Sequence, residues 1–520
     1  MKKLALVLVI LLTAITLVTT GCNKKPDDPI QLSVTVEIFN RGTSDGRSIV
    51  DDNAWTKWVQ AKVKEDLNID LTFVPVGRWS ENTDIVNLMA SGDAPDLCYT
   101  YAGDMVASFR DQGGILNLTP YIDRYLPDLK KLLGDDPAFP GKDFIYRNAD
   151  PQTGEIYSIP SYRVALAQRN VFIRKDWLDK LGLPVPTTPE QFYAALVAFR
   201  DNAATLGVSR IVPFGQNNDV RWGLANPMNH YIQDLSDRDR WVYNIHERNI
   251  LMPGYKEGVR EMNKWYNERL IYQDFPLMTT ADAFFNLIKS GVVGAFCQNW
   301  DLPYRQDSKI LEDLQANVPG ANYVVIDIFK NKDMMDKVGL QIFIPKAAEE
   351  RGAQIAALRY LNWLAKPENF SFLQLGQEGI NHVLVNGIPS VQGRPAGDEW
   401  FQNSPQNIDM TMPMNGVELG SLEMNARVLA LSYGAIPAEV IIEAYATSVR
   451  DARAAAVYQA TTTVNQYAAD LQAKADALLA QAIQASPANF DSIWDAGIAD
   501  ILATGGQEVL DERASLYPAR

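Results

Sequence analysis

The sequence is poor in the residues that build metal and redox centres, because its 520 residues include only three histidines and three cysteines. A histidine- or cysteine-rich metal site would need nearly all of them, so we expect neither a metal nor a cofactor. Basic residues are also in the minority, with 48 Lys and Arg against 63 Asp and Glu and a formal net charge of −15. An acidic surface repels phosphate backbones, which disfavours a general nucleic-acid-binding protein.

The motifs of the common catalytic sites are also missing. The chain contains no G-x-x-x-x-G-K-[ST], G-x-G-x-x-G, G-x-S-x-G, H-E-x-x-H or C-x-x-C motif. His230, His246 and His382 lie far apart in the sequence. The paired carboxylates of glycoside hydrolases have no fixed spacing, so the acidic residues leave that class open. With no positive evidence for catalysis, we expect a protein that is not an enzyme.

What the chain does contain is typical of a folded protein, with 47% hydrophobic and 21% charged residues. Its length suggests two to four domains or two large lobes, at roughly 150 residues per domain. Strands are expected at 32–39, 69–76, 96–101, 171–173, 211–214, 292–297, 323–329 and 340–344, with helices between most of them. This alternation predicts an α/β fold with mostly parallel sheets. From Ala438 onward the chain is alanine-rich, which predicts an added helical C-terminal region.

The first 30 residues are typical of a targeting signal. Two lysines precede an apolar run, Leu4 to Val18, that is shorter than the roughly 18 residues of a membrane-spanning helix. The run leads to Thr20-Gly21-Cys22 and a polar stretch, which resembles a bacterial lipoprotein signal, although Thr19 stands where Leu is more usual. The resemblance implies a signal peptide at 1–21, diacylglycerol on Cys22, a linker at 22–30 and a lipid anchor on the extracytoplasmic face of the cell membrane. The alternative is an ordinary secretion signal.

The two remaining cysteines, Cys98 and Cys297, both lie in apolar, strand-like runs. A secreted protein can form a disulfide, but one pair in about 500 residues would be no framework. Buried free thiols are therefore the favoured interpretation.

Several short segments resemble the extracellular solute-binding proteins of ABC importers. They are SGDAPDL (91–97), GILNLTPYI (114–122), YSIP (157–160), IRKDWL (173–178), IPKAAE (344–349), YLNWL (360–364) and GQEGI (376–380). As an ordered set over about residues 30–400, they are similar to family 1, in the large lipoprotein branch with LipO-like and oligosaccharide-binding members.

The resemblance implies a two-lobed, type II periplasmic-binding-protein-like fold that encloses its ligand by hinge closure. We expect lobe 1 at 31–160 plus 325–375, and lobe 2 with the C-terminal helices at 161–324 plus 376–520. It also implies ABC permease subunits as partners, no nucleic acid and a monomeric protein. The function expected is capture of a sugar or oligosaccharide for import.

Ligands of such sheets bind beyond the carboxyl ends of the strands, so candidate site residues are sought there. The candidates are Trp79, Glu81, Tyr99, Tyr101, Asp104, Tyr162, Arg163, Gln216, Asn217, Trp222, Trp300 and Asp301. Aromatic rings stack on the apolar faces of sugars, while carboxylates and amides hydrogen-bond hydroxyl groups. The set therefore favours a neutral polyol, and any of these aromatic residues could instead belong to the core.

Three alternatives remain open on the sequence alone. A receptor for a peptide or another small solute would need partners for that ligand's termini, and none can be identified. A secreted glycoside hydrolase or lyase would need two carboxylates across an open groove. A purely structural lipoprotein would lack a cleft between its lobes. The segment Asp150 to Gly154 is similar to a calcium loop but lacks alternating carboxylates, so we interpret it as a turn.

Overall fold

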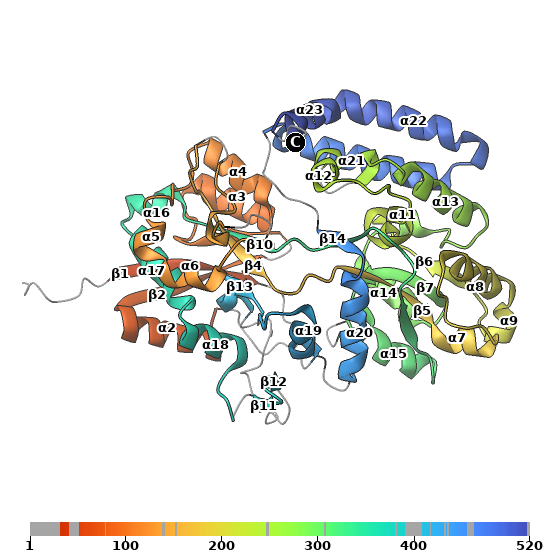
Figure 1. Ribbon diagram of the computed structural model, residues 1–520, viewed down its shortest axis with the longest axis horizontal. Helices are drawn as coiled ribbons and strands as arrows, with labels where there is room; N and C mark the ends of the chain where they lie inside the picture. The colour runs from red at the N-terminus through yellow and green to blue at the C-terminus, as the bar shows by residue number, and fades with distance from the viewer. Residues whose placement is uncertain are drawn as a thin grey trace, which may run out of the picture.

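The computed structural model describes residues 32–40, 51–77, 80–137, 141–150, 153–245, 249–305, 308–379, 382–390, 408–416, 418–430, 433, 436–454 and 462–516. Two lobes lie side by side and are joined by extended segments, with the C-terminal helices on the second lobe (Figure 1). The predicted α/β, two-lobed fold with an added helical C-terminal region is confirmed. Among the described residues, no helix combines the length and apolar character needed to cross a bilayer.

The first lobe is built on two sheets. β1 (Leu32–Asn40) pairs in parallel with β2 (Ile69–Gly77), and a bridge between Val36 and Leu97 joins β1 in parallel to the chain entering β3 (Cys98–Thr100). The second sheet has the order β13-β4-β10-β3. Its other strands are β4 (Ile159–Arg163), β10 (Val338–Phe343) and β13 (Met414–Asn415).

Helices flank these sheets. They are α2 (Ala54–Leu67), α3 (Glu81–Ser91), α4 (Gly103–Asp111), α5 (Ile122–Tyr125), α6 (Pro127–Leu133), α16 (Lys346–Glu350), α17 (Gln354–Leu364) and α18 (Pro367–Leu375). The cap of α2 is Asn53, which forms a capping box with Thr56. Trp55, Val59 and Val63 then face the core, as their helical spacing predicts.

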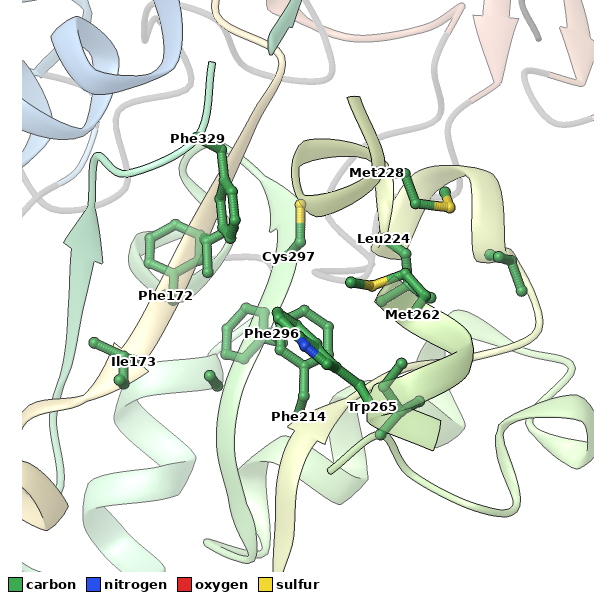
Figure 2. Close-up of a cluster of buried hydrophobic side chains, with 14 of the residues drawn as sticks. Phe172, Ile173, Phe214, Leu224, Met228, Met262, Trp265, Phe296, Cys297 and Phe329 are labelled. Carbon is green, nitrogen blue, oxygen red and sulfur yellow. The ribbon is translucent and has the colours of Figure 1, made fainter. Parts of the chain in front are cut away.

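The second lobe has one four-stranded sheet with the order β6-β7-β5-β8. The strands are β5 (Arg169–Arg174), β6 (Val212–Gly215), β7 (Val293–Asn299) and β8 (Tyr323–Ile326). Phe172 on β5 and Phe296 on β7 lie 5.3 Å apart, and Trp265 packs against Phe214 of β6 (Figure 2). This aromatic core fixes the strands whose ends carry the predicted site residues.

The helices of the second lobe are α7 (Lys175–Lys180), α8 (Pro189–Asp201), α9 (Ala203–Leu206), α10 (Val220–Gly223), α11 (Ala225–Asn229), α12 (Asp237–Tyr243), α13 (Tyr255–Asn267), α14 (Ala281–Lys289), α15 (Ile310–Asn317), α19 (Leu422–Ala430) and α20 (Ala438–Val449). The short strands β9 (Lys332–Met334) and β14 (Ala452–Ala454) pair in parallel, and β11 (Val383–Val385) forms a hairpin with β12 (Ile388–Ser390). The C-terminal helices are α21 (Thr462–Gln484), α22 (Phe490–Ile501) and α23 (Gln507–Leu516).

Each lobe has its own hydrophobic core. The first core draws on residues 34–159 and 340–373 with Met410 and Met412, and the second draws on 167–329 and 426–509. The lobe boundaries expected from the sequence stay a prediction. Cys98 and Cys297 are both buried and free, as predicted.

The sheets are mixed, because one strand in each lobe runs against the others. In the first lobe β10 runs antiparallel to both β3 and β4, and in the second lobe β5 runs antiparallel to both β7 and β8. β5 is the first strand after the chain passes into the second lobe, and β10 is the first strand after it returns to the first lobe. A strand that enters at the edge where its neighbours end must run against them.

The C-terminal helices are attached to the second lobe through α13. The side-chain amide of Asn263 donates hydrogen bonds to the carbonyl oxygens of Ala482 (2.9 Å), Ile483 (3.1 Å) and Ala485 (2.7 Å) at the end of α21. Asn263 is only 2% exposed. α21 also contacts α10 of the second lobe and α4 of the first lobe.

We expect Asn263→Ala to lower the free energy of unfolding by about 2–3 kcal/mol, because buried carbonyls at the end of α21 lose their donor. Urea denaturation followed by circular dichroism measures this loss. The matched control is Gln484→Ala, whose exposed amide donates only to Ala480 in its own helix and should change the value by less than about 0.5 kcal/mol. Equal losses in both variants would contradict the anchoring role of Asn263.

Candidate functional site

Two segments, 164–168 and 335–337, connect the lobes and together form what we call the crossing. The strand ends of each lobe form an edge that faces this crossing. β4 ends at Arg163, where the first crossing segment (164–168) begins, and β1, β2 and β3 run in the same direction as β4. β5 begins at Arg169 on the far side of this segment, and β6, β7 and β8 run against it and end at the same edge. The carboxyl ends of these seven strands therefore point toward the crossing, which is where the sequence predicts the site.

In the first lobe, the structure brings Glu81, Tyr101 and Arg163 together. The Tyr101 ring is 36% exposed and stacks on Phe39, with 6.3 Å between ring centroids and 13° between planes. The Arg163 guanidinium lies 5.9 Å from the same ring. Buried Glu81 accepts hydrogen bonds from the backbone N–H of Tyr101 (3.1 Å) and the hydroxyl of Thr100 (2.9 Å). Glu81 thus fixes the backbone that carries the exposed ring.

The other candidates of the first lobe lie apart from this cluster or outside the description. Tyr99 is buried edge-on against Phe39 at 4.8 Å, so of the two tyrosines only Tyr101, one residue beyond β3, is exposed. Tyr162 is half-buried, with the Lys337 ammonium 4.6 Å from its ring centroid. Trp79 lies outside the described residues. Asp104 lies in the first turn of α4, and its side chain is outside the description.

In the second lobe, Trp222 is the predicted residue whose ring is both fixed and partly accessible. Its indole N–H donates to the side-chain oxygen of Gln298, and the guanidinium of Arg169 lies 4.5 Å from the ring centroid. The side chain of Asp219 caps the short helix α10 and accepts a hydrogen bond from the backbone N–H of Trp222 at 3.1 Å. The ring itself is half-buried.

Gln216 supports the loop that leads to Trp222. Its amide nitrogen donates to the carbonyl oxygens of Asn217 (2.6 Å) and Asp219 (2.9 Å), and its side chain is buried. Its side-chain oxygen has no hydrogen-bond partner among the described residues. Asn217 is half-buried beside it. Gln216, Asn217 and Trp222 thus form one continuous edge after β6.

Trp300 and Asp301 are placed differently from the other candidates. Trp300 is 7% exposed, and its ring lies edge-on against Tyr445 (5.4 Å) and Tyr433 (6.0 Å). Buried Asp301 accepts from the hydroxyl of Tyr433 at 2.6 Å and forms an ion pair with Arg305 at 3.0 Å. Both residues are thus held by the core of the second lobe. Their contact with a ligand stays a prediction.

Sequence reasoning missed Arg169, Gln298 and Phe39, which orient the exposed rings. Arg169 and Gln298 are polar residues at the crossing ends of apolar strands, and this position was the available signal. Their contacts with Trp222 depend on the pairing of β5 with β7. Among the described residues, no cluster of His, Cys, Asp and Glu is suited to hold a metal ion.

A separate pocket of about 130 Å³ lies between α8, α11 and α13 of the second lobe. Its lining includes Tyr193, Tyr231, Trp265, His230 and Phe329. The Nδ1 atom of His230 accepts a hydrogen bond from the backbone N–H of Lys330 at 3.1 Å. Burial and the nearby Lys330 charge lower the pKa of His230 below its ordinary value.

We expect Trp300→Ala to lower the free energy of unfolding of the unliganded protein by about 3–5 kcal/mol, as for a tryptophan removed from a packed core. Trp222→Ala should cost clearly less, because the Trp222 ring is half-buried. Urea denaturation of both variants without sugar measures the difference. An unchanged stability in Trp300→Ala would place that ring outside the core.

The neutral form of His230 accepts the Lys330 hydrogen bond, so the folded state binds this proton less readily than the unfolded state. The stability that the neutral ring contributes is present above the unfolded pKa of about 6.5 and is lost as the pH falls through the lower folded pKa. His230→Asn keeps an acceptor but cannot titrate. We expect a shallower loss of unfolding free energy below about pH 6.5 in this variant. Identical pH profiles would contradict the role of His230.

Comparison with known proteins places the chain in a family. The sequence profile described as bacterial extracellular solute-binding protein matches residues 46–369. Lipoprotein LipO of Bacillus subtilis (strain 168) is 30% identical over 355 residues, which are 62% of this chain and 62% of LipO, so the match spans less than two thirds of that relative. The polygalacturonan/rhamnogalacturonan-binding protein YtcQ of the same organism is 22% identical over 405 residues, 73% of this chain and 74% of YtcQ.

A solved structure shares the fold. The ABC-transporter substrate-binding protein FusA of Streptococcus pneumoniae, in complex with kestose, aligns with a TM-score of 0.62 and 16% identity. The alignment covers 93% of this chain and 98% of FusA. Because the family profile matches more than half of the sequence, this protein belongs to the bacterial extracellular solute-binding protein family.

Proposed function

We propose that this protein is the substrate-binding lipoprotein of an ABC importer and captures a sugar or oligosaccharide between its two lobes. One observation carries the proposal: partly exposed aromatic rings, Tyr101 and Trp222, lie at strand ends that point toward the crossing from opposite lobes. Relatives named for fructooligosaccharide and polygalacturonan/rhamnogalacturonan binding support a carbohydrate ligand.

The chemistry of the edges fits a polyol ligand. A ring on each lobe can stack against the C–H faces of successive sugar units, while the half-buried amide of Asn217 can bond their hydroxyl groups. The buried carboxylates Glu81 and Asp301 already accept hydrogen bonds from protein groups. They act mainly as supports for the site, and the ligand meets rings and neutral amides.

Capture then follows from contacts that both lobes make with one ligand. A sugar held by Trp222 on one lobe and Tyr101 on the other stabilises the closed arrangement over the open one, which shifts the population toward closure. The closed protein would present the sugar to permease subunits in the membrane. ATP hydrolysis would occur in a partner, because the sequence has no phosphate loop.

The site of action is proposed from the N-terminal sequence. Residues 1–21 and Cys22, which lie outside the described residues, would act as a lipoprotein signal and lipid attachment site. Two acyl chains of a thioether-linked diacylglycerol suffice for stable anchoring. The protein would then sit on the extracytoplasmic face of the cell membrane as a monomer, and it would bind its solute without converting it.

A thermal-shift panel with kestose, trigalacturonic acid, maltotriose and a tetrapeptide tests this function. A sugar at a hundred times its Kd should add about 2.7 kcal/mol of stability. We expect Trp222→Ala to abolish the shift, because the ligand loses the stacking ring of the second lobe. Tyr231→Ala, which removes an exposed ring from the separate pocket, should keep it.

The same panel distinguishes the alternatives. A shift with the tetrapeptide alone would replace the carbohydrate proposal with a peptide receptor. Chromatography of the sugars after incubation would reveal cleavage products, which would instead indicate a hydrolase or lyase. A shift with no compound of the panel would remove the support for carbohydrate binding.

A further inference from the structure

The side chain of Arg169 connects half-buried Trp222 of the second lobe to the crossing. Arg169 is the first residue of β5 and is 3% exposed. Its guanidinium lies over the Trp222 ring at 4.5 Å and donates from Nη2 to Asp333. Its Nε atom is buried and has no hydrogen-bond partner among the described residues. The side chain is therefore held by one ring and one carboxylate.

Asp333 fixes the other end of this contact. It is the middle residue of β9, the strand that directly precedes the second crossing segment (335–337) and so leads to β10 of the first lobe. Its carboxylate also accepts from the amide of Asn229 at 2.8 Å, and Asn249 bonds Asn229 at 3.0 Å. A buried arginine needs such a paired acceptor, since leaving its charge uncompensated is costly.

The contacts of Trp222 leave its orientation little freedom. Gln298 holds the indole N–H, and Arg169 lies over the ring. A cation over an aromatic face contributes about 0.5–2 kcal/mol, depending on burial. A ligand that stacks on Trp222 therefore meets a ring whose position depends on Arg169 and Asp333.

The first lobe repeats the arrangement at the other end of the same crossing segment. Arg163 directly precedes residues 164–168 and lies 5.9 Å from the Tyr101 ring, whereas Arg169 directly follows them. One short segment thus carries, at its two ends, the arginines that contact Tyr101 in the first lobe and Trp222 in the second. A change in the direction of this segment moves both contacts.

We propose that Arg169 is a positioning residue for ligand capture: it holds Trp222 in the orientation that stacks on the sugar and, through Asp333, ties that ring to the second crossing segment. This inference rests on the proposed function and adds the residue that makes the Trp222 contact depend on the hinge. Arg169 itself is too buried to serve as the main ligand contact.

β5 provides a matched control at its opposite end. Arg174 is also buried, lies 4.7 Å from the ring of Trp177 and pairs with Asp176 at 2.7 Å, but it is at the end of β5 away from the crossing. Arg169→Lys and Arg174→Lys each keep the charge and lose the planar group that covers a tryptophan. Any effect of general destabilisation should therefore appear in both variants.

The first measurement needs no ligand. The difference in fluorescence between each protein and its Trp222→Phe counterpart isolates the emission of Trp222, and acrylamide quenching reports access to that ring. We expect quenching of Trp222 to increase in Arg169→Lys and, to a lesser degree, in Asp333→Asn. It should stay at the wild-type level in Arg174→Lys. Unchanged quenching in folded Arg169→Lys would overturn the proposal.

The second measurement is calorimetric titration with kestose and with trigalacturonic acid. For the sugar that binds wild type, we expect a Kd roughly tenfold higher in Arg169→Lys and little change in Arg174→Lys. An equal loss in both arginine variants would mean that Arg169 is only structural, which overturns the proposal. If neither sugar binds wild type, the carbohydrate function loses its support, while the quenching experiment still decides whether Arg169 positions Trp222.

Discussion

The arrangement of this protein depends on the hydrogen bonds between its two crossing segments. The backbone N–H of Arg163 donates to the carbonyl of Lys337 at 2.6 Å, and the N–H of Met335 donates to the carbonyl of Leu166 at 2.9 Å. Because the segments run side by side, β5 and β10 must each start at the edge that faces the other lobe. The remaining strands then end at that edge, which places their following loops around one region.

Two kinds of support keep the rings at this region in place. Backbone contacts hold the loops, as where Glu81 accepts from the N–H of Tyr101 and Asp219 caps α10. Arginines then hold the rings, and each charge comes from an end of the first crossing segment. Because the buried Arg169 guanidinium pairs with half-buried Asp333, moving the Trp222 ring also disturbs an ion pair. The Trp222 ring and the second crossing segment are thus physically linked through Arg169 and Asp333.

Local signals made much of the fold predictable. Asn53 and the Thr188-Pro189 pair mark helix starts by their caps, and the alternation of strands and helices gives the α/β class. The burial of Trp300 could not be predicted, because Tyr433 and Tyr445 that cover it come more than 130 residues later. The direction of β5 and β10 could not be predicted either. It depends on the lobe from which the chain arrives, and hydrophobic periodicity carries no information about strand direction.

The C-terminal helices also contact both lobes. Asn263 binds the end of α21 to α13, and α21 lies against α10, the helix that carries Trp222. α21 also reaches α4, which follows Tyr101 in the first lobe. Under the hinge closure that we propose, a rotation that brings the two strand edges together would also change the contact between α4 and α21. On this proposal, the added helices would contribute to the energy difference between the open and closed arrangements, in addition to the crossing segments and the ligand.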